Sequence, residues 1–144
     1  MSYKFLYRAL RQEEIENQCN PLSKIQKPFK DNPLLGTGDA RFPINLGETE
    51  EYAVRHHQNG FPTKGISTTP HLEIAKKYSR AGVIIKINFS NLEEHGIKAY
   101  IVKDWLKFPE DIIKPEDDEI ILVMQDSTVF PKDLIQEVIK IPSY

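Results

Sequence analysis

The sequence contains a single cysteine, Cys19, in 144 residues, so no disulfide can form within the chain. The same count excludes a zinc site built on several thiolates. Proteins that fold in an oxidising compartment usually carry paired cysteines. We therefore expect a cytoplasmic protein, or one that is delivered into the cytoplasm of a target cell.

Long apolar runs and a surplus of basic residues are missing as well. No stretch approaches the roughly 18 apolar residues of a membrane-spanning helix, and the first residues lack the apolar core of a secretory signal. The 19 Lys and Arg residues against 21 Asp and Glu residues give a net charge of −2. This balance excludes a general nucleic-acid coat, which needs excess positive charge. The charge balance does not exclude a nucleic acid as a substrate. Because long apolar runs are missing, we expect no membrane partner.

The remaining composition is that of one globular unit. Hydrophobic residues make up 40% of the chain, which is enough for one core. We find no internal repeat and no long linker, and therefore expect a single domain over residues 1–144. Proline and glycine interrupt the stretch from Asn20 to Gly60, and a loop-rich stretch of this length is usually functional.

The pattern of apolar residues predicts an α+β fold with a mainly antiparallel sheet. Helices are expected at Gln12–Gln18, from Pro70 to about Arg80, and at Glu50–His57 inside the loop-rich stretch. For the second helix, Thr69 is the expected N-cap and Gly82 the expected end. Its buried stripe is expected at His71, Ile74, Ala75 and Tyr78. The expected strands are Lys4–Leu10, Gly65–Thr69, Val83–Phe89, Ile97–Val102, Glu119–Met124 and Val138–Ile141.

Arg8 lies inside the first predicted strand. A buried arginine needs a partner, because an unpaired buried charge is very costly. One interpretation is a structural ion pair, or a strand-edge arginine that points outward. The other is a phosphate clamp, for which the planar guanidinium is well suited.

Ser67-Thr68-Thr69 connects a predicted strand to a predicted helix. These hydroxyl residues are ordinary for a strand that ends in a capped helix. A small hydroxyl at the end of a strand can also orient a neighbouring carboxylate or a ligand hydroxyl. The sequence leaves both interpretations open.

An acidic run, Glu116-Asp117-Asp118-Glu119, precedes the apolar run that starts at Ile120. Most of such a run is expected in solvent, but Glu119 directly adjoins the predicted buried strand. A carboxylate at the mouth of a buried strand is a candidate for chemistry. Four consecutive residues cannot all face one ion, so we expect no metal site here.

Taken in order, these three elements resemble the mono-ADP-ribosyltransferases of the Arg–Ser–Glu group, the branch that contains cholera toxin and heat-labile enterotoxin. The resemblance spans residues 5 to about 141. It implies the ADP-ribosyltransferase-like fold, with a split antiparallel sheet and short helices, and NAD as the donor of ADP-ribose without a metal. The matching motifs are Tyr7-Arg8-Ala9, Gly65-Ile66-Ser67-Thr68-Thr69 before a helix with Ala75 and Tyr78, and Asp117-Asp118-Glu119-Ile120.

The resemblance also implies roles for individual residues. Glu119 would stabilise the positive charge on the ribose, and Ser67 would hold Glu119 in place. Arg8, with the adjoining Ala9, would hold the NAD phosphates. Thr68 and Thr69 would support the strand and the helix cap around the bound NAD.

Several further residues have two interpretations. Tyr78 faces the nicotinamide or packs in the core. Arg11 assists Arg8 on the phosphates or lies in solvent. His56 or His57 matches a histidine that the enterotoxin branch carries ahead of the Ser-Thr motif, or lies on the surface.

The implied acceptor is a macromolecule, either protein or nucleic acid. Arginine-modifying members carry Glu or Gln two residues before the catalytic glutamate, and that residue activates the acceptor nucleophile. The resemblance therefore implies a catalytic role for Asp117, which occupies this position here and is one methylene shorter. Other protein side chains, or a nucleic-acid base or phosphate, are therefore open as acceptors. The setting that the resemblance implies is an intracellular toxin, effector or phage-defence toxin with a neutralising antitoxin or immunity protein. The alternatives are an NAD glycohydrolase on the same fold and a non-enzymatic binding module.

Overall fold

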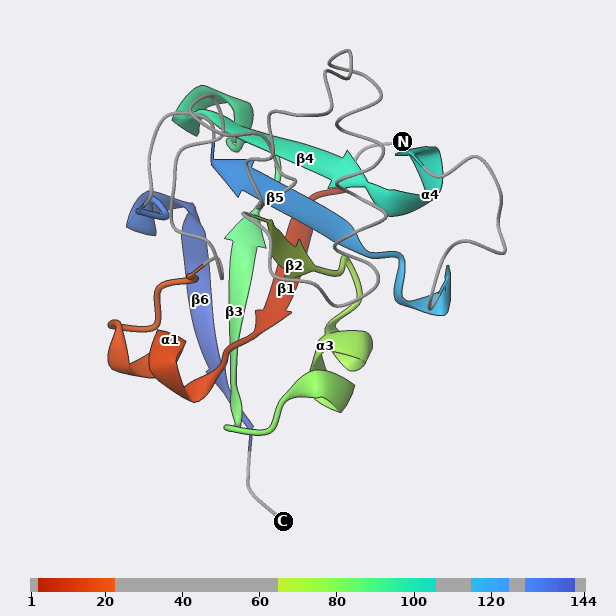
Figure 1. Cartoon of the computed structure of the whole chain (residues 1–144). Helices are drawn as coiled ribbons and strands as arrows, with labels where there is room; N and C mark the ends of the chain where they lie inside the picture. The colour runs from red at the N-terminus through yellow and green to blue at the C-terminus, as the bar shows by residue number, and fades with distance from the viewer. Residues whose placement is uncertain (1–2, 23–64, 106–114, 125–128, 142–144) are drawn as a thin grey trace, which may run out of the picture.

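The computed structural model describes residues 3–22, 65–105, 115–124 and 129–141, which form a small α+β protein with two antiparallel sheets (Figure 1). The predicted helix at Glu50–His57 and most of the predicted loop from Asn20 to Gly60 lie outside these ranges. No helix in the described ranges is long and apolar enough to cross a membrane.

The first sheet has the strand order β1-β3-β6, with β1 at Phe5–Ala9, β3 at Val83–Asn88 and β6 at Ile135–Lys140. The central strand β3 is rich in isoleucine, whose β-branched side chain favours strands. Ile85 and Ile87 are buried as their alternation predicts, but Ile84 is buried too. Both faces of β3 are therefore covered at this point.

The second sheet has the strand order β2-β5-β4, with β2 at Ile66–Thr68, β5 at Ile120–Met124 and β4 at Ile97–Ile101. Every residue of β5 is buried, as expected for a continuous apolar run in the middle of a sheet. In the register of the β2–β5 pair, Ser67 lies opposite Ile121 and Thr68 opposite Ile120. This pairing brings Ser67 close to Glu119, which directly precedes β5.

Within the described ranges, one β-bridge joins the two sheets. The backbone N–H of Tyr7 donates to the carbonyl of Thr69 at 2.7 Å, and the N–H of Thr69 donates to the carbonyl of Tyr7 at 3.0 Å. The bridge holds β1 beside the end of β2. Arg8 of β1 and Ser67 of β2 are consequently neighbours, although they are 59 positions apart in the chain.

The helices are short: α1 covers Gln12–Glu16, α3 covers Leu72–Tyr78 and α4 covers Val102–Trp105. In the described parts of the chain, single turns of 3₁₀ helix cover Glu93–His95, Pro115–Asp117 and Lys132–Leu134. The turn at Pro115–Asp117 leads directly to Asp118, Glu119 and β5.

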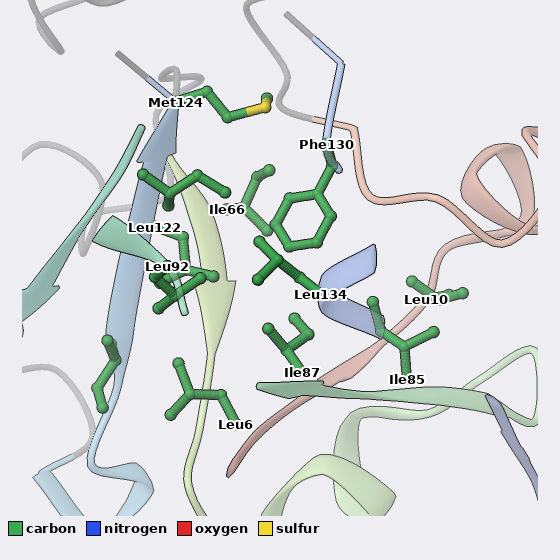
Figure 2. Packing of buried hydrophobic residues seen from close by; sticks show 12 residues of the cluster. Leu6, Leu10, Ile66, Ile85, Ile87, Leu92, Leu122, Met124, Phe130 and Leu134 are labelled. Atoms are coloured by element: carbon green, nitrogen blue, oxygen red, sulfur yellow. The ribbon is translucent and has the colours of Figure 1, made fainter. Parts of the chain in front are cut away.

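Apolar side chains from both sheets form one core cluster (Figure 2). Leu6, Ile85 and Ile87 come from the first sheet, and Ile66 and Leu122 come from the second. Phe130 and Leu134 are fully buried in the same cluster, next to the start of β6. The cluster fixes the two sheets against each other and so fixes the bridge between β1 and β2.

The start of α3 differs from the prediction. The helix begins at Leu72 with His71 as its N-cap, rather than at Pro70 with Thr69 as its N-cap. Thr69 instead forms the bridge to Tyr7 with its backbone, and its hydroxyl donates to the carbonyl of Asp117. The Thr69 hydroxyl does accept a hydrogen bond from the N–H of His71 at 3.2 Å.

The predicted buried stripe and end of α3 are also wrong. Of its four expected residues, only Ala75 is buried, and Tyr78 is 47% exposed. A helix of seven residues presents too short a face for a continuous stripe. It ends at Tyr78, and Gly82, with a φ of +80°, forms the turn into β3 instead.

Candidate functional site

Arg8 is 11% exposed, and its guanidinium lies between Glu14 and Ser67. Nε and Nη2 donate to Oε2 of Glu14 at 3.0 and 2.9 Å, and Nη1 donates to the backbone carbonyl of Ser67 at 2.8 Å. Burial holds the pKa of Arg8 below its ordinary value, and the adjacent Glu14 carboxylate offsets part of this shift. Arg8 thus has the ion-pair partner that its buried position requires.

Glu14 is the residue of this site that the sequence analysis missed. Its side chain is fully buried, and besides Arg8 it accepts hydrogen bonds from the backbone N–H groups of Arg11 at 2.9 Å and Leu22 at 2.8 Å. The one available signal was its position three residues after the N-cap Arg11, where a glutamate typically returns to the cap N–H. Glu14 therefore fixes both the guanidinium of Arg8 and the start of α1.

The Ser67 hydroxyl donates a short hydrogen bond to Oε2 of Glu119. The next two hydroxyls continue this pattern: Thr68 donates to the carbonyl of Ile120, and Thr69 donates to the carbonyl of Asp117, both at 2.7 Å. Three consecutive hydroxyl residues thus fasten the segment that leads into β5. Thr68 is buried, and its hydroxyl is used in the hydrogen bond to the backbone of β5.

Asp118 stabilises the same segment from the outside. Its backbone is left-handed, with a φ of +49°, and its carboxylate lies 2.7 Å from Nε2 of His71 and 3.0 Å from Nζ of Lys103. The hydrogen bond with His71, followed by that with Lys103, lowers the pKa of Asp118. In turn, the Asp118 carboxylate raises the pKa of Lys103.

Tyr78 does not pack in the core, so that interpretation is wrong. The side chain is exposed, and its hydroxyl donates a short hydrogen bond to Oδ2 of Asp117. The members of the acidic run therefore have different surroundings. Glu119 contacts Ser67, Asp118 contacts His71 and Lys103, Asp117 contacts Tyr78, and Glu116 is exposed.

The other predicted site residues are Arg11, Ala9, and His56 or His57. Arg11 is 35% exposed, lies 3.4 Å from Glu13 and donates to the carbonyl of Leu22 at 2.7 Å. Ala9 ends β1 and pairs with Ile84 of β3. His56 and His57 lie outside the described residues. Within the described parts of the chain, no group of three or more His, Cys, Asp or Glu residues is placed to hold a metal ion.

Arg8, Ser67 and Glu119 therefore form one connected group at the junction of the two sheets. The backbone carbonyl of Ser67 accepts from Arg8, and its hydroxyl donates to Glu119. Such a group places a fixed cation and a fixed carboxylate near each other, which suits a reaction that separates charge. In comparisons with known proteins, no family model and no curated sequence matches the chain.

Proposed function

We propose that this protein is a mono-ADP-ribosyltransferase that transfers ADP-ribose from NAD to a macromolecular acceptor. The observation that supports the proposal best is the double contact of Ser67, which joins Arg8 to Glu119. The three residues occur in the order that the sequence resemblance implies. They come from β1, β2 and the residue before β5, and only the fold brings them together.

Glu119 is the proposed catalytic residue. Breaking a glycosidic bond passes through a transition state with positive charge on the sugar, which a nearby carboxylate stabilises. The hydrogen bond from Ser67 holds Oε2 of Glu119 in one orientation before the substrate arrives. A preorganised charge is effective because it requires no reorganisation during the reaction.

Arg8 is the proposed contact for the NAD phosphates, and its remaining donors fit this role. A guanidinium has five N–H donors, and three of them are used on described residues. One N–H on each Nη atom is left for a phosphate oxygen. Arg11 is the proposed second phosphate contact, and Ala9 and Thr68 support the strands beside the dinucleotide. NAD itself supplies a nicotinamide that leaves readily.

We further propose that the protein acts inside a cell as a toxin, an effector or a phage-defence toxin. An antitoxin or immunity protein would then neutralise it. An NAD glycohydrolase would use the same three residues with water as the acceptor. A non-enzymatic binding module would use none of them for chemistry.

One experiment separates these functions. The purified protein is incubated with NAD carrying a labelled adenylate phosphate, with and without cell lysate, and released nicotinamide is measured. The labelled fraction is then treated with protease or with nuclease. We expect the label in macromolecules, and loss of the label under only one treatment identifies the acceptor class. Release at the full rate without lysate, with no macromolecular label, contradicts the transferase proposal and indicates a glycohydrolase. No release in either case contradicts enzymatic function.

A further inference from the structure

Asp118 directly precedes the proposed catalytic residue Glu119, and side chains of two other elements hold its carboxylate. We propose that the carboxylate of Asp118 positions Glu119 for the breaking of the bond between ribose and nicotinamide. His71 and Lys103, which contact this carboxylate, act on Glu119 through it. This inference rests on the proposed ADP-ribosyltransferase function and adds the residues that place its catalytic carboxylate.

The backbone of Asp118 is in the left-handed region, with a φ of +49°. Residues with a side chain rarely adopt this conformation, although aspartate tolerates it better than most. Such a conformation persists only where the surrounding contacts hold it, and it is found more often at active sites. In this chain it lies between the turn at Pro115–Asp117 and β5. It therefore determines the direction in which the backbone reaches Glu119.

The Asp118 carboxylate is held from two sides, and Figure 1 shows the segment before β5 between α3 and α4. Nε2 of His71, the N-cap of α3, lies 2.7 Å from Oδ2, and Nζ of Lys103 in α4 donates to Oδ1 at 3.0 Å. An ionised carboxylate only accepts hydrogen bonds, so His71 is the donor in its pair. Each oxygen thus has its own donor, and the carboxylate cannot rotate without breaking one of these bonds.

Helix α4 holds the backbone of Glu119 as well as the carboxylate of Asp118. The N–H of Val102 donates to the carbonyl of Glu119 at 3.1 Å, and the next residue, Lys103, bonds to Asp118. Val102 is buried, so this end of α4 is anchored in the protein interior. Two consecutive residues of α4 therefore fasten two consecutive residues of the site.

Ser67 and Asp118 fix Glu119 at opposite ends of its side chain. The Ser67 hydroxyl bonds to Oε2 at the far end, whereas the contacts of Asp118 fix the backbone from which the side chain starts. A glutamate side chain has considerable rotamer freedom. One bond at its tip does not define the position of the carboxylate unless its start is fixed too. A displacement on the order of 1 Å at a reacting group can lower the rate about 100-fold.

The charges in this group favour an effect on position rather than on stability. The hydrogen bond with His71, followed by that with Lys103, lowers the pKa of Asp118, and Asp118 raises the pKa of Lys103. Asp118 and Lys103 are therefore both charged near neutral pH. All three side chains are partly exposed, and ion pairs in contact with solvent contribute little to the free energy of folding.

The affected step is the loss of nicotinamide. The bond between C1 of the nicotinamide ribose and the nicotinamide nitrogen breaks, and its electron pair leaves with nicotinamide. The ribose carbon is positively charged until the acceptor or water adds to it and loses a proton to solvent, and Glu119 stabilises that charge. The proposed phosphate contact, Arg8, bonds to Glu14 and the backbone of Ser67 and not to Asp118. A loosened Asp118 should therefore lower kcat and leave the KM for NAD nearly unchanged.

The test measures nicotinamide release from NAD by the full chain and its variants. Lys103→Met keeps a long side chain without the charge, and His71→Phe keeps a planar ring without the N–H. The matched controls are Lys76→Met and His95→Phe. Lys76 forms an exposed ion pair and His95 an exposed hydrogen bond, and neither has a role in the proposed site.

We expect Lys103→Met and His71→Phe each to lower kcat about tenfold, with the KM for NAD within about twofold of the unmodified value. Lys103→Arg keeps the cation and should retain most of the rate. The two control variants should keep the unmodified kcat. A merely structural role would lower the free energy of unfolding, measured with urea, and would not separate kcat from KM.

A glycine at position 118 tests whether both contacts act through the carboxylate. Asp118→Gly removes the carboxylate, and glycine readily adopts the left-handed backbone, so the variant should fold. We expect its kcat to fall about 100-fold. Lys103→Met and His71→Phe should then have no further effect in the Asp118→Gly background, because the group through which they act is gone.

The outcomes distinguish the inference from the proposed function. An unmodified kcat in Asp118→Gly, a loss confined to KM, or further losses from Lys103→Met in the Asp118→Gly background overturn the positioning role while the NAD chemistry stands. If the unmodified protein releases no nicotinamide under any condition, the proposed function itself fails and the inference fails with it.

Discussion

The Ser67 hydroxyl donates a hydrogen bond to the carboxylate of Glu119, 52 positions further along the chain. The same residue accepts a hydrogen bond from Arg8 through its backbone carbonyl. Ser67 therefore connects the only guanidinium that is nearly buried in the described residues to a carboxylate at the mouth of a buried strand. The following predictions test what this connection does.

Replacing Ser67 with alanine should lower the rate of nicotinamide release about 100-fold, because Glu119 loses the donor that fixes its orientation. The KM for NAD should change much less, since Arg8 bonds to the backbone of Ser67 and not to its hydroxyl. Steady-state kinetics measures this effect. Ser90→Ala is the control, because the exposed Ser90 hydroxyl donates to Asn88, and Ser90 has no role in the proposed site. A loss confined to KM would contradict an orienting role for Ser67.

Replacing Glu14 with glutamine should destabilise the fold by about 3 kcal/mol, because Arg8 would become a buried charge without its partner. Urea denaturation measures the free energy of unfolding. Glu16→Gln is the matched control on the same helix: Glu16 is exposed, and its replacement should change stability by less than about 0.5 kcal/mol. Equal stability of the two variants would show that Glu14 does not compensate the charge of Arg8.

The lowered pKa of Asp118 predicts a specific pH dependence of stability. A carboxyl group whose pKa is lower in the folded state stabilises the fold above its ordinary value of 3.8, and this contribution is lost as the pH falls below that value. Asp118→Asn removes the charge, and asparagine tolerates the left-handed backbone at this position. The stability advantage of the unmodified protein should therefore be present near pH 5 and shrink toward about pH 2.5. Urea denaturation across this range checks the prediction, and an advantage that grows on acidification would contradict it.

Local patterns in the sequence were enough to predict most of the strands. The apolar run after Glu119 predicted β5, which is buried at every residue. The aromatic and aliphatic residues around Arg8 predicted β1, and the alternation after Gly82 predicted β3. These predictions succeeded because burial in a sheet leaves a signal of period two or a continuous apolar run.

The contacts that build the site required the fold. The bond between Glu14 and Arg8 depends on how α1 turns back on β1, and the sequence pattern showed Glu14 only as one acid in a short acidic helix. The bridge between Tyr7 and Thr69 occupies the residue expected to cap α3, which begins at Leu72. Such long-range pairings leave no periodic signal in the sequence.

The most direct test of the central claim is the rate of nicotinamide release from NAD by Glu119→Gln compared with Glu116→Gln. Both variants exchange one carboxylate for an amide in the same segment, but Glu119 contacts Ser67 and Glu116 is exposed. We predict that Glu119→Gln loses activity by about 100- to 1,000-fold, with its folded structure retained by circular dichroism, and that Glu116→Gln keeps the unmodified rate. An unmodified rate in Glu119→Gln would contradict the assignment of this site.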